Sequence, residues 1–151
     1  MSDSVKGMVA GAVATAVLSL VMLLVGAIGF EPQLELTRLL LAALDVPTTQ
    51  YALGWVLHLV TGSVILGGLF AYIEPKLGVD THTKGGVLYG VFTWLVVMLF
   101  FMPAAGAGYF GFQFSVLAPI VMLGLQVLYG GVLGWTYGRL SPSPFGKHHP
   151  A

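Results

Sequence analysis

Four long apolar stretches alternate with short polar segments and take up most of the chain. They run from 7 to 30, 51 to 73, 85 to 102 and 118 to 140, and they contain no Asp, Glu, Lys or Arg before Arg139. A bilayer core about 30 Å thick needs roughly 20 apolar residues of helix. We therefore predict an all-α integral membrane protein with four transmembrane helices, whose single domain covers residues 1–140.

The two connections that follow the first and third stretches are expected to lie on the outer side. In 31–50, Leu36, Leu40 and Leu44 recur at four-residue spacing after Pro32, which predicts a short amphipathic helix on the outer surface, ending near Pro47. The segment 103–117 is apolar but rich in glycine and proline. Because proline disfavours helix at the residue before it, we expect the third helix to end before Pro103 and the aromatic residues beyond it to lie at the membrane interface.

The central connection and the C-terminal tail are polar. The central loop offers Asp80, Thr81 or Thr83 as a cap for the third helix, and His82 is expected to be solvated. The tail 141–151 is proline-rich and is expected to be disordered.

The positive charges are sorted by side. Lys6, Lys76, Lys84, Arg139 and Lys147 fall in the N-terminal tail, the central loop or the C-terminal end, whereas Arg38 alone falls in the first connection. The positive-inside rule then predicts a multi-pass protein of the plasma (inner) membrane with both termini in the cytoplasm.

Composition excludes several other classes. Charged residues make up 8% of the chain, against about 25% in soluble domains, and the formal net charge is zero, so no basic face is available for nucleic acid. There is no cysteine, which excludes disulfides, thiolate metal sites and cysteine nucleophiles. We predict no metal site.

The first half of the chain is similar to the second. Lys6, Gly7, Val9, Val13 and Thr15 recur as Lys84, Gly85, Val87, Val91 and Thr93, and Leu57, His58 and Gly62 align with Leu125, Gln126 and Gly130. The pattern predicts two similar hairpins related by an axis along the membrane normal, which is a parallel internal repeat.

Small and polar residues form stripes at helical spacing. Ser19 follows Gly7, Gly11 and Thr15 in the first helix, and the glycine positions predicted for helix packing are Gly7, Gly11, Gly54, Gly62, Gly130, Gly134 and Gly138. Counting inward along the helices places Ser19, His58 and Gln126 at one depth, about 10 Å below the outer interface. We predict a buried polar layer of these three residues.

The predicted layer has three interpretations. Polar side chains can hydrogen-bond across helices and fix their register without any chemistry. A buried histidine can also carry protons or line a polar path, as in a small transporter or channel. Thirdly, His58 could ligate haem, although the matching position holds Gln126, a poor iron ligand. The second ligand would then be His58 of another copy or one of Met22, Met98, Met102 and Met122.

Five segments carry a resemblance to a family. GMVAGAVATAVLSLVM, LGWVLHLVTG, KGGVLYGVFTWLVV, MPAAGAGYFG and YGGVLGWTYGRL resemble a family of small prokaryotic four-helix membrane proteins of uncharacterised function. The resemblance covers 7–140 and implies fold and membrane location, with no activity to transfer. It also implies histidine in many relatives where this chain has Gln126, which disfavours haem further.

The function predicted from these patterns is not enzymatic. No serine, histidine and carboxylate set can be assembled in the helices, because all six acidic residues lie in predicted loops or tails. The glycine stripes exceed what four helices must use among themselves. We therefore expect an accessory or scaffold subunit of a larger membrane assembly, with lipid and another membrane protein or a second copy as partners and no bound cofactor.

Overall fold

Four helices are long and apolar enough to cross a membrane: Asp3–Ala27, Tyr51–Lys76, His82–Ala104 and Ala118–Leu140. We call them the first to fourth spans. The structure, a computed structural model, describes residues 1–27, 36–47 and 49–141. No strand occurs within these described ranges. The predicted all-helical fold with four such helices is therefore confirmed.

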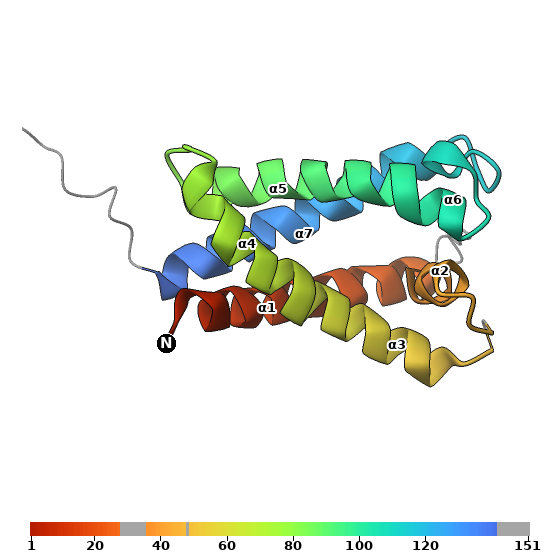
Figure 1. The fold of residues 1–151 in the computed structure, drawn as a ribbon, viewed down its shortest axis with the longest axis horizontal. Coiled ribbons are helices and arrows are strands. Elements are labelled where there is room, and N and C mark those ends of the chain that lie inside the picture. The colour runs from red at the N-terminus through yellow and green to blue at the C-terminus, as the bar shows by residue number, and fades with distance from the viewer. Residues whose placement is uncertain (28–35, 48, 142–151) are drawn as a thin grey trace, which may run out of the picture.

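Figure 1 shows how the helices are arranged, with the colour following the chain from the N-terminus to the C-terminus. The first span is the single helix α1, and the fourth is the single helix α7. The second and third spans are each built from several helical pieces. The elements are α1 (Asp3–Ala27), α2 (Leu36–Ala43), α3 (Tyr51–Val60), η1 (Thr61–Leu66), α4 (Gly67–Ile73), η2 (Glu74–Lys76), α5 (His82–Val96), η3 (Val97–Phe101), α6 (Met102–Ala104), η4 (Tyr109–Gly111) and α7 (Ala118–Leu140).

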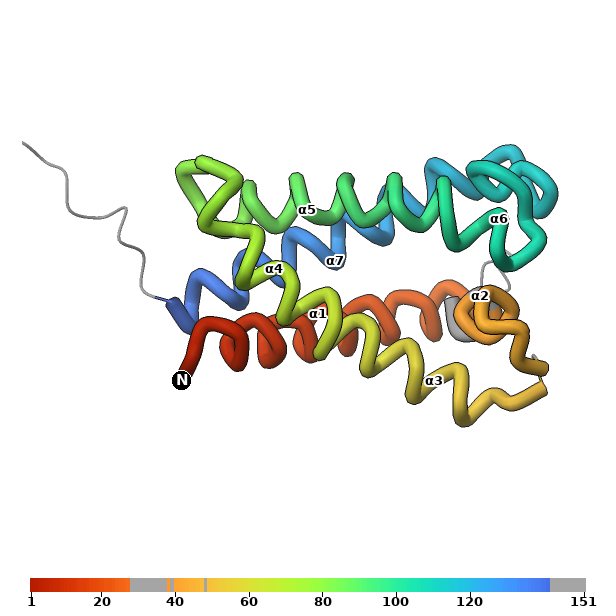
Figure 2. Tube along the Cα trace, viewed as in Figure 1, coloured from red at the N-terminus to blue at the C-terminus, as the bar shows by residue number. Residues whose placement is uncertain are grey.

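The spans pack as two hairpins. In one hairpin α1 packs against η1 and α4, and in the other α5 packs along α7, while α1 also contacts α7 and so joins the two hairpins. Figure 2 shows the second span bending along its path, with α3 directed away from α5. We call the end that holds the start of α1, the loop from η2 to α5 and the end of α7 the terminal end, and the opposite end the α2 end.

Glycines set the closest contacts within both hairpins. A Cβ added to Gly11 would lie 2.7 Å from the carbonyl oxygen of Gly62, and one added to Gly86 would lie 2.8 Å from the backbone nitrogen of Gly134. Real Cβ atoms do not approach backbone this closely, so only glycine permits these helix separations. Four of the predicted packing glycines have such backbone neighbours, namely Gly7, Gly11, Gly130 and Gly134, whereas an added Cβ would meet the Thr15 side chain at Gly62 and the His82 side chain at Gly138. Gly54, the seventh, is buried.

The second and third spans each contain a π segment, where the spacing of the buried positions changes. Buried positions upstream in the second span are four residues apart, but Gly67 follows Gly62 after five. In the third span, Met98 likewise follows Thr93 after five residues. A π turn closes i→i+5 hydrogen bonds and accommodates one more residue than an α turn. The segments η1 and η3 therefore keep both halves of each helix facing the bundle.

Two expectations about the α2 end are changed by the structure. The third span continues through Pro103, because the π segment η3 ends directly before α6 and loosens the turn that the proline ring would otherwise strain. The amphipathic helix is present as α2 but ends at Ala43, and Asp45 takes a positive φ of 56°. Leu41 is completely buried, so α2 packs into the α2 end, where it contacts α3. Pro32 and the tail 142–151 lie outside the described residues.

Candidate functional site

Ser19 and His58 form a buried hydrogen-bonded pair between the first and second spans. Ser19 Oγ lies 3.1 Å from His58 Nε2 and donates its own proton to the carbonyl oxygen of Thr15, 2.8 Å away. When the hydroxyl donates to Thr15, it accepts a hydrogen from the Nε2 tautomer of His58. The histidine is 6% exposed, and the ring of Trp55 meets it edge-on at 5.8 Å. The pair joins the two helices of one hairpin.

Gln126 lies in the other hairpin and has a different partner. It is 7% exposed, and its Oε1 accepts a hydrogen bond of 3.1 Å from Thr93 Oγ1. Thr93 also lies 2.9 Å from the carbonyl oxygen of Gly90, in the geometry of a threonine bonding back along its own helix. The three residues of the predicted layer are thus buried or partly buried, but they do not form one cluster. Ser19 pairs with His58 in the first hairpin, and Gln126 pairs with Thr93 in the second.

Two tyrosines connect the hairpins through the backbone of the second span. Tyr129 donates its hydroxyl hydrogen to the carbonyl oxygen of Gly62, and Tyr89 donates to that of Leu66 at 2.9 Å. Both acceptors lie in the π segment η1, where the regular α-helical hydrogen-bond series is interrupted. Carbonyl groups in a bundle interior require such partners. The hydroxyls therefore stabilise the irregular turn and fix the position of one hairpin on the other.

A second buried polar pair lies at the terminal end, and here the expectation for His82 is wrong. Its Nδ1 is 2.6 Å from Oε1 of Glu74, and the two side chains are 11% and 6% exposed. Pro75 bends the chain out of α4 through η2, and Thr81 caps α5 by accepting from the Lys84 amide at 3.3 Å, so the short loop returns His82 to Glu74. Glu74 is therefore not the loop carboxylate that its position beside Pro75 indicates.

An aromatic barrier separates the two polar regions. The ring of Phe70 is completely buried and lies 5.3 Å from the ring of Tyr89 and 5.4 Å from that of Tyr137. Tyr137 in turn contacts the ring of His82 at 5.5 Å. The rings of Phe70, Tyr89 and Tyr137 therefore lie between the His58 pair, towards the α2 end, and the Glu74 pair, at the terminal end.

The described residues do not form a metal site of the usual kind. No group of three or more His, Cys, Asp and Glu side chains converges within the described ranges. Of the methionines considered as haem ligands, Met98, Met102 and Met122 pack together with two alanines in a core cluster of their own, and Met22 packs against the other cluster. Packing accounts for these methionines, and Nε2 of His58 is already bonded to Ser19.

Sequence reasoning missed Glu74, Tyr89 and Tyr129 as members of the buried polar regions. A signal was present for Tyr129, because it lies three residues after Gln126 and so shares its helix face. No comparable signal marks Glu74, since a glutamate beside a loop proline is ordinarily exposed. Taken together, these polar pairs and tyrosine hydroxyls hold helices in register, whereas the buried Oγ1 of Thr136 has no hydrogen-bond partner among the described residues.

Comparisons with known proteins give a family and nothing further. A family model described as a family of unknown function (DUF6789) matches residues 1–147. No curated protein matches the chain. No solved structure matches it either.

Proposed function

Because this chain belongs to DUF6789, a family of unknown function, we propose its role from its own structure: a non-enzymatic accessory or scaffold subunit of a larger membrane assembly. The observation that supports the proposal is that polar side chains inside the bundle are paired with one another. Three hydrogen-bonded pairs lie there: Ser19 with His58, Thr93 with Gln126, and Glu74 with His82. Because these three pairs use their polar atoms inside the chain, the large apolar side chains exposed on the outside are the surface left for a partner.

The site of partner binding differs from the one expected. The glycine stripes pack against each other inside the hairpins, so they supply no spare surface for another protein. A partner would instead meet the large apolar side chains on the outside. Those on the outer face of the third span, for example, are Leu88, Phe92 and Leu95 of α5 and Leu99 of η3.

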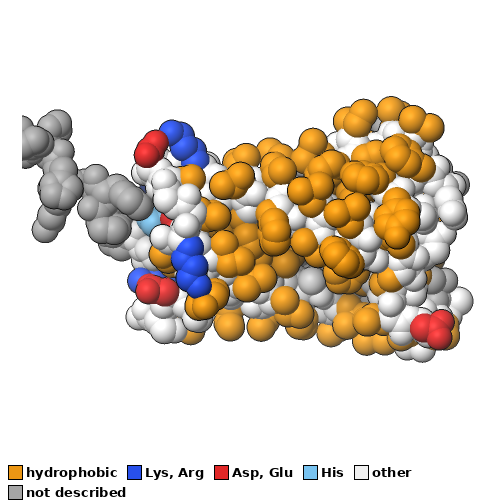
Figure 3. Space-filling view, turned by 45° about the horizontal axis from the view of Figure 1, so that its top comes forward, with side chains coloured by type: hydrophobic (Ala, Val, Ile, Leu, Met, Phe, Trp, Pro, Cys, Tyr) orange, Lys and Arg blue, Asp and Glu red, His pale blue; other side chains and the backbone are white. Residues whose placement is uncertain are grey.

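The proposed location is the plasma (inner) membrane, with both termini in the cytoplasm. On the face drawn in Figure 3, every Lys and Arg side chain lies at the terminal end, and apolar side chains cover the length between the ends. Lys6, Lys76, Lys84 and Arg139 all belong to that end. The natural chain has no cysteine, so single cysteines placed at Gly78 and Gly106 would report orientation by labelling with a membrane-impermeant maleimide. Labelling of Gly78→Cys in intact cells would contradict the orientation.

We also propose that the two hairpins are a parallel internal repeat. The supporting observation is a contact made by aligned residues, because His58 and Gln126 each hydrogen-bond to a hydroxyl of the preceding span, Ser19 and Thr93 respectively. Aligning the first half of each related chain with its second half would test this, and we expect the same positions to match in most relatives. Relatives whose two halves share no such positions would contradict it.

A small proton transporter or channel is the second candidate, favoured by the buried His58. An ionisable side chain inside a membrane bundle is costly and commonly serves transport. On this proposal Phe70 closes the path, because its ring lies between the polar regions. Phe70→Ala should then raise proton flux into proteoliposomes, and His58→Ala should abolish that flux.

Native mass spectrometry of the protein extracted from its own membrane in mild detergent separates the two candidates. An accessory role predicts added protein mass, retained when His58 is replaced by alanine. A bare monomer or homo-oligomer, together with proton flux that depends on His58, would overturn the accessory proposal. Added haem mass that is lost with His58→Ala would overturn both proposals.

A further inference from the structure

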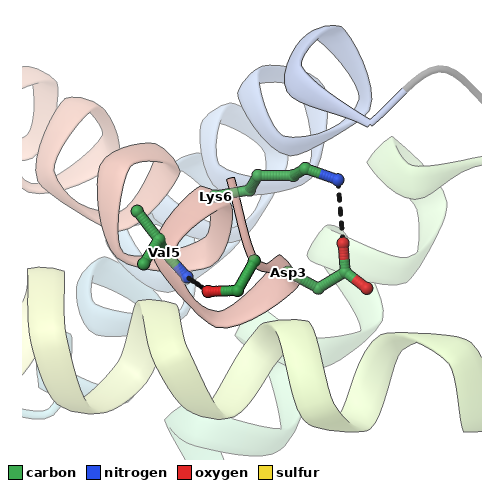
Figure 4. Close-up of polar contacts among 4 residues, drawn as sticks. Asp3, Val5 and Lys6 are labelled. Carbon is green, nitrogen blue, oxygen red and sulfur yellow. Dashed lines mark hydrogen bonds and ion pairs between the residues drawn. The ribbon is translucent and has the colours of Figure 1, made fainter.

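Among the described residues, four Lys and Arg side chains lie at the terminal end, and they are of two kinds. Lys6 is paired with Asp3 at 2.8 Å (Figure 4), and Lys84 is paired with Asp80 at 3.1 Å. These two charges are neutralised locally. Lys76 and Arg139 have no carboxylate within ion-pair distance among the described residues.

Lys76 and Arg139 instead each lie over an aromatic ring on their own helix. Lys76 Nζ is 3.4 Å from the ring centroid of Tyr72, and Arg139 Cζ is 4.9 Å from that of Trp135. Both pairs have i, i+4 spacing, which places the cation one turn nearer the helix end than the ring. The rings are 67% and 53% exposed, so both face away from the bundle.

The position of these pairs fits the headgroup layer of a membrane. Each lies at the end of a span, with an amphipathic ring followed by a cation, and tyrosine and tryptophan prefer this depth. A bare aromatic face could bind the quaternary ammonium of choline, but here the face is already covered by a cation. The hydrogen-bond donors of the lysine and the arginine remain available for an anion, and guanidinium binds phosphate oxygens in a bidentate manner.

We propose that the Tyr72/Lys76 and Trp135/Arg139 pairs bind the headgroups of anionic phospholipids. The ring anchors the pair among the acyl chains and glycerol groups, while the uncompensated cation contacts the phosphate. Charge complementarity selects an anionic lipid over a zwitterionic one. This proposal does not depend on the accessory role.

The test measures binding of phosphatidylglycerol and phosphatidylcholine to the detergent-solubilised full chain by native mass spectrometry. We expect phosphatidylglycerol to bind more tightly to the natural protein. A double variant, Lys76→Gln with Arg139→Gln, should weaken phosphatidylglycerol binding about fivefold at each site, the effect expected for one cation near an anionic surface. Phosphatidylcholine binding should change little.

The matched control is Lys6→Gln with Lys84→Gln, which removes the same formal charge from the same end. Because those lysines are already paired with aspartates, this variant should retain phosphatidylglycerol binding within about twofold. Equal losses in the two double variants would show that only net charge matters and would overturn the proposal. So would equal affinity of the natural protein for the two lipids, or displacement of phosphatidylglycerol by inorganic phosphate. Circular dichroism of each variant confirms that it is folded.

Discussion

Replacement of Gly130 by alanine tests the packing of the second hairpin. The added Cβ would come closest to the carbonyl oxygen of Gly86, and it would lie 2.9 Å from the carbonyl carbon of that residue and 3.1 Å from the Cα of Gly90. Because non-bonded heavy atoms pack at about 3.5–4.0 Å, α5 and α7 would have to separate by about 1 Å or more. Overpacking of this kind costs about 1–3 kcal/mol, and the better helix propensity of alanine returns about 1 kcal/mol. We expect a net loss of about 0–2 kcal/mol.

Gly124→Ala is the matched control for this experiment. Gly124 lies in the same helix, and an added Cβ there meets nothing within 4 Å. Only the propensity gain of about 1 kcal/mol remains, so the two variants should differ by the overpacking cost of about 1–3 kcal/mol. Titration with sodium dodecyl sulfate in mixed micelles, followed by far-ultraviolet circular dichroism, measures the difference. If Gly130→Ala unfolds no earlier than Gly124→Ala, the close approach of α5 and α7 is not limiting and the reasoning is wrong.

Three further substitutions test the local interactions in the same unfolding assay. Thr81→Ala should cost about 1 kcal/mol through loss of the α5 cap, whereas Thr83→Ala should cost less, and equal costs would count against the cap. Glu74→Gln should cost about 2 kcal/mol because it weakens a buried charge-assisted hydrogen bond, and an unchanged stability would contradict the pairing with His82. Tyr89→Phe should cost about 1 kcal/mol by leaving a carbonyl group of η1 unsatisfied, an effect that exposed Tyr109→Phe should not reproduce.

The fold was predictable because it depends on local hydrophobicity and length. The apolar runs determine where the spans lie, and small residues at four-residue spacing indicate which helix faces meet, as Gly11 and Gly62 illustrate. The polar site was only partly predictable. Ser19 and His58 share a depth and prove to be partners, but Gln126 binds Thr93, since helix counting gives depth without specifying the neighbour.

Interactions across the loop were beyond prediction for a physical reason. Whether Glu74 is exposed depends on how η2 returns the chain to α5, which is a property of the folded hairpin rather than of the residues around it. The π segments were missed because periodicity was read as a uniform helix. The sequence signal for η1 is the change in spacing after Gly62, because the next glycine on the same helix face, Gly67, follows after five residues instead of four.

The π segments also determine where the spans tolerate changes in length. One residue deleted from an ordinary α-helix rotates everything beyond it by about 100° and takes the buried face out of the bundle. Deletion of exposed Val64 from η1, or of Phe100 from η3, would instead restore four-residue spacing and leave both halves of the helix facing inward. A homologue that is one residue shorter at either place therefore retains the same bundle, and a gap in an alignment there marks a regularised helix turn.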